Sequence, residues 1–455
     1  MEELSNIISK IDNFLWNWPL LILLLGTHIF LTIRLKFIQR YIGKAIKLSV
    51  TKDEDAKGDV SQFSALTTAL AGTIGTGNIV GVATAISLGG PGAVFWTWLT
   101  GVFGISTKYA ESLLATKYRV KTKDGTMAGG PMYVLENGLN KKWLGVLFAA
   151  FTSIAAIGTG GMVQSNAIST MVNDTFKIPT QVIGIIIAIL TAVVILGGIK
   201  SISKVCQVFV PFMAGFYIIG CIIILVIGYK QIPNSLHTII TSAFTGQAAV
   251  GGFAGSSVIM AMRYGVSRGL FSNESGLGSA PIVSAAAQTR NPVRQALVAC
   301  TGTFWDTVVV CAMTGLVLTN TGVWNKGLQG GQLTKEAFSS IPVIGSTVLT
   351  IGLMAFAFST ILGWSYYGEK SIEYLFGKKA ILPYKIVWII MVYIGAIFSL
   401  DFVWNFADLA NGLMAIPNLI SLIALSGVIV KETKKYLWEN NLDQVAIEED
   451  KVANL

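Results

Sequence analysis

Long apolar blocks separated by short charged segments dominate the pattern of this chain. Residues 20–31, 183–196 and 387–400 are nearly continuous apolar runs, without the alternation that a half-buried strand or helix would show. A helix needs about 20 predominantly apolar residues to cross the hydrocarbon core of a bilayer. The pattern therefore predicts an all-α integral membrane protein.

Eleven membrane-spanning helices are predicted along the chain. An odd number of spans places the two termini on opposite sides of the membrane. The spans centre near Leu24, Ala71, Gly104, Ala156, Ala188, Ile218, Phe253, Val308, Phe356, Tyr393 and Met414.

The basic residues orient these spans, because cytoplasmic loops retain Lys and Arg during insertion. Segments 34–57, 117–142, 200–204, 263–294, 370–385 and the tail from 431 hold nearly all of them on one side. We expect that side to be cytoplasmic, with the N-terminus outside, the C-terminus inside and the chain in the cell (inner) membrane. The first apolar run is expected to persist as a span, because acidic residues precede it where a cleaved signal carries positive charge. The basic residues left on the outer side are Lys10, Lys177, Lys230, Lys326 and Lys335.

Composition excludes several classes of function. The chain is 53% hydrophobic and 13% charged, too little charge for a water-soluble surface. Its net charge of +9 follows from the loop residues, so no nucleic-acid partner is expected. The two histidines stand apart and the four cysteines fall in apolar stretches, which disfavours an enzyme. Neither an organic cofactor nor an obligatory protein partner is expected.

The first span is treated as an extra helix, and the remaining ten divide into two groups of five that start from opposite sides. Two groups with an odd number of spans have opposite orientations in the membrane, which is the pattern of an inverted repeat. The predicted units are residues 1–61, an extra helix with a basic loop; 62–230 and 231–432, the two five-helix repeats; and 433–455, a cytoplasmic tail.

Glycine clusters interrupt the first helix of each predicted repeat, at residues 71–81 and 251–257. Non-helical backbone inside a membrane is tolerated where it is buried in protein or lines a cavity. Unwound amides suit a carboxylate, and freed carbonyls suit an ammonium group or a metal cation. The pair therefore favours a carrier for a zwitterion with a cation over a channel. Close helix packing through small residues is the alternative explanation.

Two motifs carry a family resemblance. Residues 89–98, GGPGAVFWTW, look like the signature of the alanine or glycine:cation symporter family, with Thr97 where members usually carry methionine. Residues 268–278, RGLFSNESGLG, are a second run typical of that family. The resemblance covers residues 63–430 and implies a leucine-transporter-type fold. It also implies sodium-coupled symport of alanine or glycine by alternating access, with Na⁺ as the co-transported ion.

The resemblance also implies a substrate site at Gly75-Thr76-Gly77-Asn78. The amides of Thr76 and Gly77 are expected to hold the substrate carboxylate, and the carbonyl of Thr73 its ammonium group. Gln164 is expected over the substrate or as a link between helices. Trp364 is expected to close the side-chain end of the pocket, with a lipid-facing tryptophan as the alternative. The second glycine cluster adds Gly252, Phe253 and Ser256.

The sodium site implied by the resemblance combines three carbonyls with two hydroxyls. The alternative is that the hydroxyls bond back to their own helix. The expected ligands are Ala71, Ile74, Phe356, Ser359 and Thr360.

Two buried acids have open roles. Glu111 is expected either to brace the broken helices or to pair with Lys108. Asp306 lies deep in a span and is expected to serve a second cation, a proton or the structure. If either acid titrates during transport, the chain is a proton-coupled amino acid symporter of the same fold, which is the alternative function.

Overall fold

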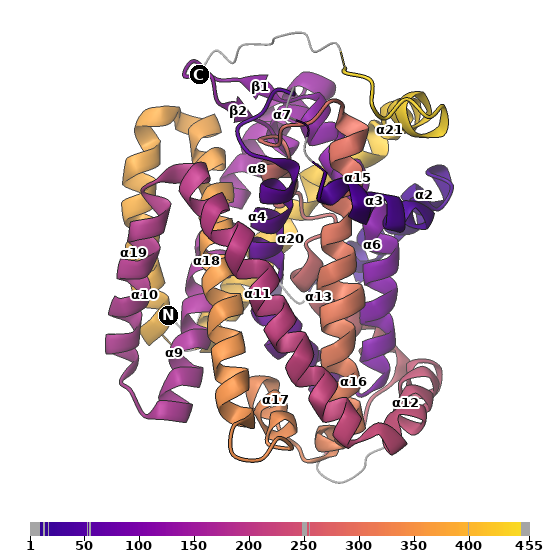
Figure 1. Cartoon of the computed structure of the whole chain (residues 1–455), viewed down its shortest axis with the longest axis vertical. Helices are drawn as coiled ribbons and strands as arrows, with labels where there is room; N and C mark the ends of the chain where they lie inside the picture. The colour runs from indigo at the N-terminus through magenta and orange to yellow at the C-terminus, as the bar shows by residue number, and fades with distance from the viewer. Residues whose placement is uncertain are drawn as a thin grey trace.

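The computed structural model describes residues 10–11, 14–16, 18–51, 53, 56–247, 253, 255–398 and 400–446. Within this part, long helices run side by side along the long axis of the molecule (Figure 1). The only sheet found here is a hairpin of β1 (Val120–Lys121) and β2 (Met127–Ala128), antiparallel with Val120 opposite Ala128. The predicted all-α class is confirmed.

The first half of the bundle runs from α2 to η5. Its elements are α2 (Trp18–Arg34), η1 (Ile38–Tyr41), α3 (Ile42–Ser49), α4 (Gln62–Thr73), η2 (Gly77–Gly81), α5 (Val82–Gly89), α6 (Gly92–Lys117), α7 (Pro131–Tyr133), η3 (Val134–Gly138), α8 (Lys142–Ala155), η4 (Ala156–Met162), α9 (Val163–Phe176), α10 (Thr180–Ile195), α11 (Gly198–Ile227) and η5 (Tyr229–Gln231).

The second half runs from α12 to η9. Its elements are α12 (Ile232–Thr245), α13 (Val258–Asn273), α14 (Pro281–Ser284), α15 (Pro292–Thr303), η6 (Phe304–Cys311), α16 (Ala312–Asn320), η7 (Val323–Asn325), α17 (Gly330–Phe338), α18 (Gly345–Phe376), η8 (Lys378–Ala380), α19 (Ile381–Ile397), α20 (Leu400–Ala424), α21 (Ser426–Thr433) and η9 (Lys434–Trp438).

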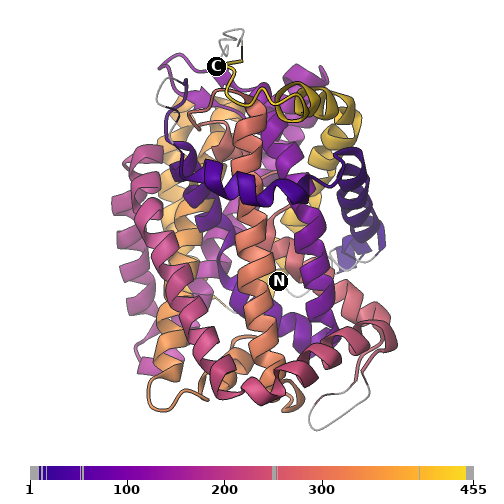
Figure 2. The same ribbon diagram turned by 45° about the vertical axis from the view of Figure 1, so that its right-hand side comes forward.

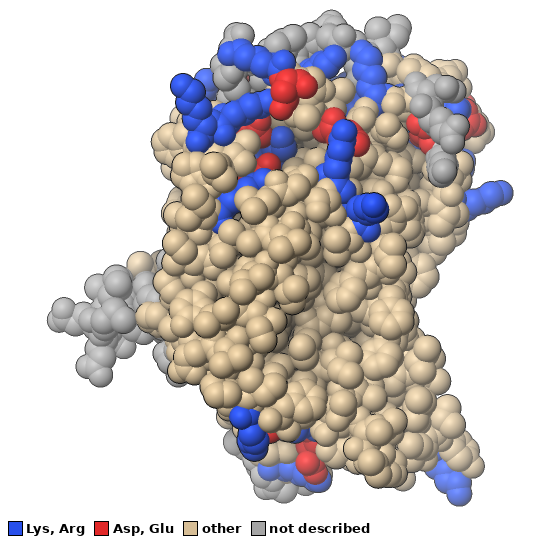
Figure 3. All heavy atoms as spheres, turned by 60° about the vertical axis from the view of Figure 1, so that its left-hand side comes forward, with Lys and Arg blue, Asp and Glu red and all other residues tan. Residues whose placement is uncertain are grey.

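The surface separates into a charged region at each end and an uncharged band between them (Figure 3). In the described residues, five helices are long and apolar enough to span a membrane, or eight if each of three bent pairs counts as one span. A multi-pass membrane protein follows, although this count is lower than the predicted eleven.

The two ends of the bundle differ in their elements. Helices α3 and α21 and strands β1 and β2 lie at one end (Figure 1). We call it the basic end, because Lys and Arg side chains gather there (Figure 3). At this end α3 lies across the bundle instead of along it (Figure 2). Helices α12 and α17 occupy the opposite end.

The first predicted break is confirmed. Helix α4 ends at Thr73, Ile74 leaves the helical region at ψ 91°, and the chain restarts at Gly77 with a bend of 49°. Helix α4 packs against α11, α15 and α18, and η2 packs against α13. The break therefore lies at the centre of the bundle.

The second predicted break was misplaced. The described residues of the cluster at 251–257, namely 253 and 255–257, lie in the connection between α12 and α13 and not inside a span; Gly251, Gly252 and Ala254 are outside the described residues. The break comes after α13, where Glu274, Gly276 and Gly278 all have left-handed φ between 56° and 94°. Helix α14 resumes at Pro281.

Moving this helix also corrects the assignment of two basic residues. Arg263 and Arg268 lie within α13 instead of a loop at the basic end. Helix α13 packs against α5 and α6, and Arg268 pairs with Asp408 of α20 at 3.1 Å. Arg268 is thus a partly buried helix residue. It cannot be counted among the loop residues from which the orientation in the membrane was predicted.

Candidate site at the broken helices

The break in the first core helix is capped by its own sequence. The amide of Gly75 donates to Oδ1 of Asn78 at 2.8 Å, as the backbone amide of an N-cap residue does to the side chain three residues later in a capping box. Residues 77–81 continue as a π-helical turn, a rare geometry that occurs mostly at functional sites. Two further π-helical stretches, η4 and η6, lie in the helices that face this break.

The five predicted sodium ligands converge. Ser359 Oγ lies 3.4 Å from the carbonyl oxygen of Ala71, and Thr360 Oγ1 lies 3.4 Å from that of Ile74. Both hydroxyls also lie 2.8–3.0 Å from the carbonyl oxygen of Phe356. All five residues are buried.

This donor set has the chemistry of a group I cation site, since every atom is a hard, uncharged oxygen. The hydroxyls also bond back to Phe356 on their own helix, so the alternative geometry is present as well. The 3.4 Å contacts to Ala71 and Ile74 join α18 to the unwound end of α4. Hydrogen bonds from the hydroxyls to their own helix do not explain why the same hydroxyls also contact the carbonyls of Ala71 and Ile74.

The predicted substrate side is occupied by side chains from α9 and α18. The amide of Thr76 donates to Oε1 of Gln164 at 3.2 Å, and Gln164 Nε2 donates to the carbonyl of Thr159 at 3.0 Å. A side-chain oxygen thus lies where a substrate carboxylate oxygen is expected. Thr73, the last residue of α4, and Gly77 are buried beside them.

Trp364 is buried and does not face lipid. Its indole N–H donates to the carbonyl oxygen of Gly72 at 3.2 Å, across the break. Gly160 lies so close that a Cβ there would approach Trp364 Cβ to 2.1 Å. The ring therefore fits the space left by a glycine and contacts the unwound segment.

Asp306 links the two broken helices. Its carboxylate accepts from Asn78 Nδ2 at 2.7 Å, from Ser272 Oγ at 3.0–3.1 Å and from Thr307 Oγ1 at 2.6 Å. Asn78 belongs to η2 and Ser272 to α13. Asn78 uses its oxygen to cap the first break and its amide to hold Asp306, so both of its polar atoms are engaged within the protein.

Glu111 holds the second break. Its Oε1 accepts from the amides of Gly276 and Gly278 at 2.9 and 3.1 Å, and from Asn418 Nδ2 at 2.6 Å. The Nζ of Lys108 is 4.0 Å from Oε2. Both roles expected for Glu111 are therefore present, and the hydrogen bonds to unwound backbone are the closer contacts.

Phe253 and Ser256 are not brought to the site. Ser256 Oγ donates to the carbonyl of Gly89 at 2.9 Å, and Phe253 packs edge-on against Trp324. Gly89 is the last residue of α5, about 18 Å along the helix from Gly77 at 1.5 Å per residue. Phe253 and Ser256 thus belong to a connection near the end of α5, away from the break.

Sequence reasoning missed the site residues on α13. Ser272 bonds Asp306, and a Cβ on Gly77 would touch Ser272 Cα at 3.0 Å and Phe271 Cδ1 at 3.4 Å. Asn273 donates to Thr307 and accepts from the amide of Ser275. Phe271, Ser272 and Asn273 all lie in the run 268–278. The polar residues and glycines of that run are the sequence feature that could have indicated a site there.

A cavity of about 520 Å³ opens next to this site. Its lining includes Val80, Ala167 and Leu353. These lie one helical turn from Thr76, Gln164 and Phe356 respectively, on three different elements. The rest of the lining comes from Gln329 and α17, from the later parts of α5 and α9, and from Arg268 of α13. The cavity thus leads from the end opposite the basic end toward the break.

Comparisons with known proteins agree with this arrangement. A family model described as the sodium:alanine symporter family matches residues 1–450. The sodium/alanine symporter AgcS of Methanococcus maripaludis is 52% identical over 445 residues, covering 95% of this chain and 97% of that protein. An uncharacterised transporter of Haemophilus influenzae is 52% identical over 449 residues, covering 97% and 98%.

Among solved structures, MhsT in complex with L-phenylalanine matches with a TM-score of 0.60 at 15% identity, covering 85% of this chain and 95% of that one. At this identity the likeness bears on the fold alone. The fold is of the leucine-transporter type.

Proposed function

Because the chain belongs to the sodium:alanine symporter family, we propose that it carries alanine or glycine into the cell together with Na⁺ by alternating access. The family consists of secondary active transporters, and the chain is a symporter, not an enzyme. The observation that carries the proposal is the meeting of two hydroxyls and a carbonyl of α18 with the carbonyls of Ala71 and Ile74 at the break between α4 and η2.

In the proposed mechanism Na⁺ binds among the oxygens of Ala71, Ile74, Phe356, Ser359 and Thr360. Binding there holds the unwound end of α4 against α18. The substrate carboxylate takes the amides of Thr76 and Gly77, displacing the oxygen of Gln164 from Thr76. The ammonium group faces the carbonyl of Thr73. Because both ligands use the same unwound segment, each stabilises the arrangement that the other needs.

The size of the substrate is proposed to be limited by Trp364. Its ring is fixed on one side by Gly160 and on the other by the carbonyl of Gly72. A fixed indole leaves little room beyond a methyl group or a hydrogen. Alanine and glycine are the amino acids with such side chains.

Asp306 and Glu111 are proposed as braces and not as proton carriers. The Asp306 carboxylate receives hydrogen bonds from three side chains, and Glu111 receives three bonds at one oxygen. Each acid holds one end of a break to a neighbouring helix. These contacts to groups on either side of a break support a bracing role for both side chains.

The architecture is proposed to comprise eleven spans. They are α2, α4–α5, α6, α8–α9, α10, α11, α13–α14, α15–α16, α18, α19 and α20. The first is an extra helix, and the other ten form two inverted repeats, with a break in the first helix of each. The Lys and Arg side chains at the basic end support a cytoplasmic location for that end and for the C-terminus, with the N-terminus outside.

Transport in liposomes tests the proposal. Purified protein should accumulate labelled alanine when an inward Na⁺ gradient is imposed in the presence of a protonophore. Replacing Na⁺ by K⁺ at the same ionic strength should abolish accumulation. Accumulation driven by a proton gradient in the absence of Na⁺ would instead establish the proton-coupled alternative.

A further inference from the structure

A buried arginine at the basic end joins two segments that are far apart in the sequence. Arg294, near the start of α15, has a side chain only 5% exposed. Its Nε lies 2.8 Å from Oδ2 of Asp53, and its Nη1 lies 2.8 Å from Oδ1 of Asp443. Asp53 precedes α4, and Asp443 lies in the C-terminal tail. One guanidinium therefore ties the tail to the approach of the first broken helix.

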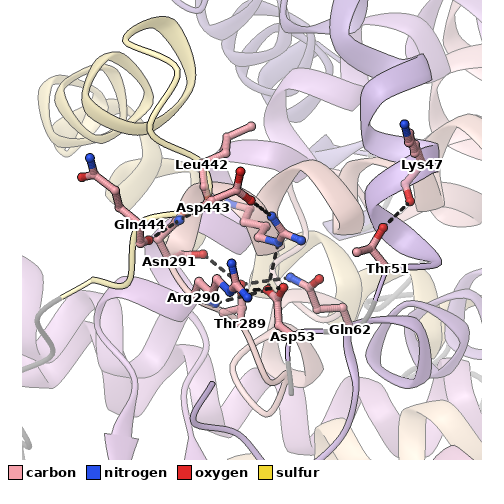
Figure 4. A network of polar contacts seen from close by, with 11 residues as sticks. Lys47, Thr51, Asp53, Gln62, Thr289, Arg290, Asn291, Leu442, Asp443 and Gln444 are labelled. Atoms are coloured by element: carbon pink, nitrogen blue, oxygen red, sulfur yellow. Dashed lines mark hydrogen bonds and ion pairs between the residues drawn. The ribbon is translucent and has the colours of Figure 1, made fainter. Parts of the chain in front are cut away.

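The tail also docks through its backbone. Asn291 Nδ2 donates to the carbonyls of Leu442 and Gln444 at 2.8 and 3.0 Å (Figure 4). The amide of Ala446 donates to the carbonyl of Arg290 at 2.7 Å. The side chain of Leu442 is buried. Residues 442–446, which we call the strap, thus lie along residues 290–291.

The segment beneath the strap closes the basic end. Residues 285–291 connect α14 to α15, and the amide of Gln288 donates to the carbonyl of Val60 at 2.7 Å. Gln62 Nε2 donates to Thr289 Oγ1 at 2.9 Å. The approaches to both broken helices, α4 and α14, are therefore bonded to each other under the strap.

These two approaches are the parts that must separate if the site is to open at the basic end. The cavity described above leads to the other end, whereas at the basic end the two approaches are bonded to each other. We propose that residues 442–446 act as a releasable strap that holds the basic end closed and sets how often it opens. The inference rests on the proposed alternating access but on none of the proposed ligands.

The strap is built to detach without disturbing the bundle. Asp443 is 84% exposed, so it is solvated when it leaves Arg294. Asp53 is 1% exposed and stays paired with the same guanidinium. Detachment therefore leaves no uncompensated buried charge, which would otherwise be expensive.

Two substitutions loosen the strap from opposite sides. Asp443→Asn removes the exposed charge. Asn291→Asp removes the donor to the tail carbonyls while keeping the oxygen that caps α15 through the amide of Arg294. The matched control is Gln444→Ala, because that side chain bonds only Asn441 and its docked carbonyl is retained. We expect amide hydrogen exchange in residues 285–291 to accelerate roughly three- to ten-fold in both variants and not in the control.

The same proteins in liposomes connect the strap to transport. We expect the alanine concentration for half-maximal uptake from the cavity side to rise several-fold in both variants, because fewer molecules face that side. Unchanged exchange at 285–291 in both variants would overturn the strap. Faster exchange without Na⁺-driven uptake in any form, the unmodified protein included, would contradict the proposed function and leave the strap standing.

Discussion

At the scale of single residues, Trp364 joins the proposed substrate pocket to the break. Replacing it with phenylalanine removes the bond to Gly72 and part of the ring volume while keeping an aromatic group on α18. We expect uptake of larger neutral amino acids, such as valine, to rise about ten-fold or more relative to alanine, since one methylene in a pocket is worth about ten- to 200-fold. Competition against labelled alanine measures this ratio.

The control for this prediction is Trp388→Phe. Trp388 is also a fully buried tryptophan, but it lies on α19 against Tyr384. Its replacement should cost stability without changing the preference among substrates. If Trp364→Phe leaves the preference unchanged as well, Trp364 does not set the size of the substrate.

Thr360 separates sodium binding from packing. Thr360→Val preserves the shape of the side chain but removes the hydroxyl that faces the carbonyls of Ile74 and Phe356. We expect the Na⁺ concentration for half-maximal uptake to rise at least ten-fold, because the proposed cation site loses one of its oxygen ligands and the two buried carbonyls lose a hydrogen-bond donor. Thr360→Ser retains the oxygen and should stay within a few-fold of the unmodified protein. Equal sodium dependence in Val and Ser variants would exclude Thr360 as a ligand.

The role of a residue could be predicted from sequence where it depends on a local motif, but not where it depends on a partner far away in the chain. The proposed sodium ligands were assigned from a motif on two helices, and the structure brings all five residues together. Asn78 was expected to face the substrate, yet both of its polar atoms are engaged by Gly75 and Asp306. Asp306 is 228 positions away, and no local pattern indicates which of several buried polar groups will pair.

At the scale of elements, helix η4 approaches α18 through a glycine that tolerates no side chain. A Cβ on Gly160 would come within 2.1 Å of Trp364 Cβ, whereas the nearest atom to a Cβ on Gly161 is 3.7 Å away. We expect Gly160→Ala to lower the melting temperature and alanine uptake strongly, because overpacking a core costs about 1–3 kcal/mol. Gly161→Ala, the adjacent control, should be nearly neutral. Similar losses in both would show that helix propensity at this turn matters more than the contact with Trp364.

The two breaks explain why one could be located from sequence and the other could not. The first lies inside a segment that was correctly predicted as a span, so the glycines within it indicated the break. In the second half, the densest glycines lie in a connection, and glycine density does not distinguish a loop from a broken span. Helix α13 is only 16 residues long and contains Arg263 and Arg268. It therefore lacks the long apolar run by which a membrane-spanning helix is predicted. Its break depends on Glu111 of α6, a tertiary contact.

At the scale of the whole molecule, the structure has an open cavity at one end and bonded approaches at the other. Thr84 of α5 lines the cavity, whereas its neighbour Ala83 is fully buried. The four native cysteines are all buried and free, so they give little background for thiol labelling. A cysteine at residue 84 therefore reports how accessible the cavity is.

We expect Thr84→Cys to react with a membrane-impermeant maleimide added from outside, and Ala83→Cys to react far more slowly. Alanine with Na⁺ should slow labelling of Thr84→Cys several-fold, because binding both ligands favours closure of the cavity. Alanine with K⁺ should leave the rate unchanged, since substrate without its cation does not assemble the site. Labelling of residue 84 only from the cytoplasmic side would reverse the proposed orientation. If neither Na⁺ nor alanine changes the labelling rate, the cavity is not the route to the transport site, because access to a carrier site must change when the site fills.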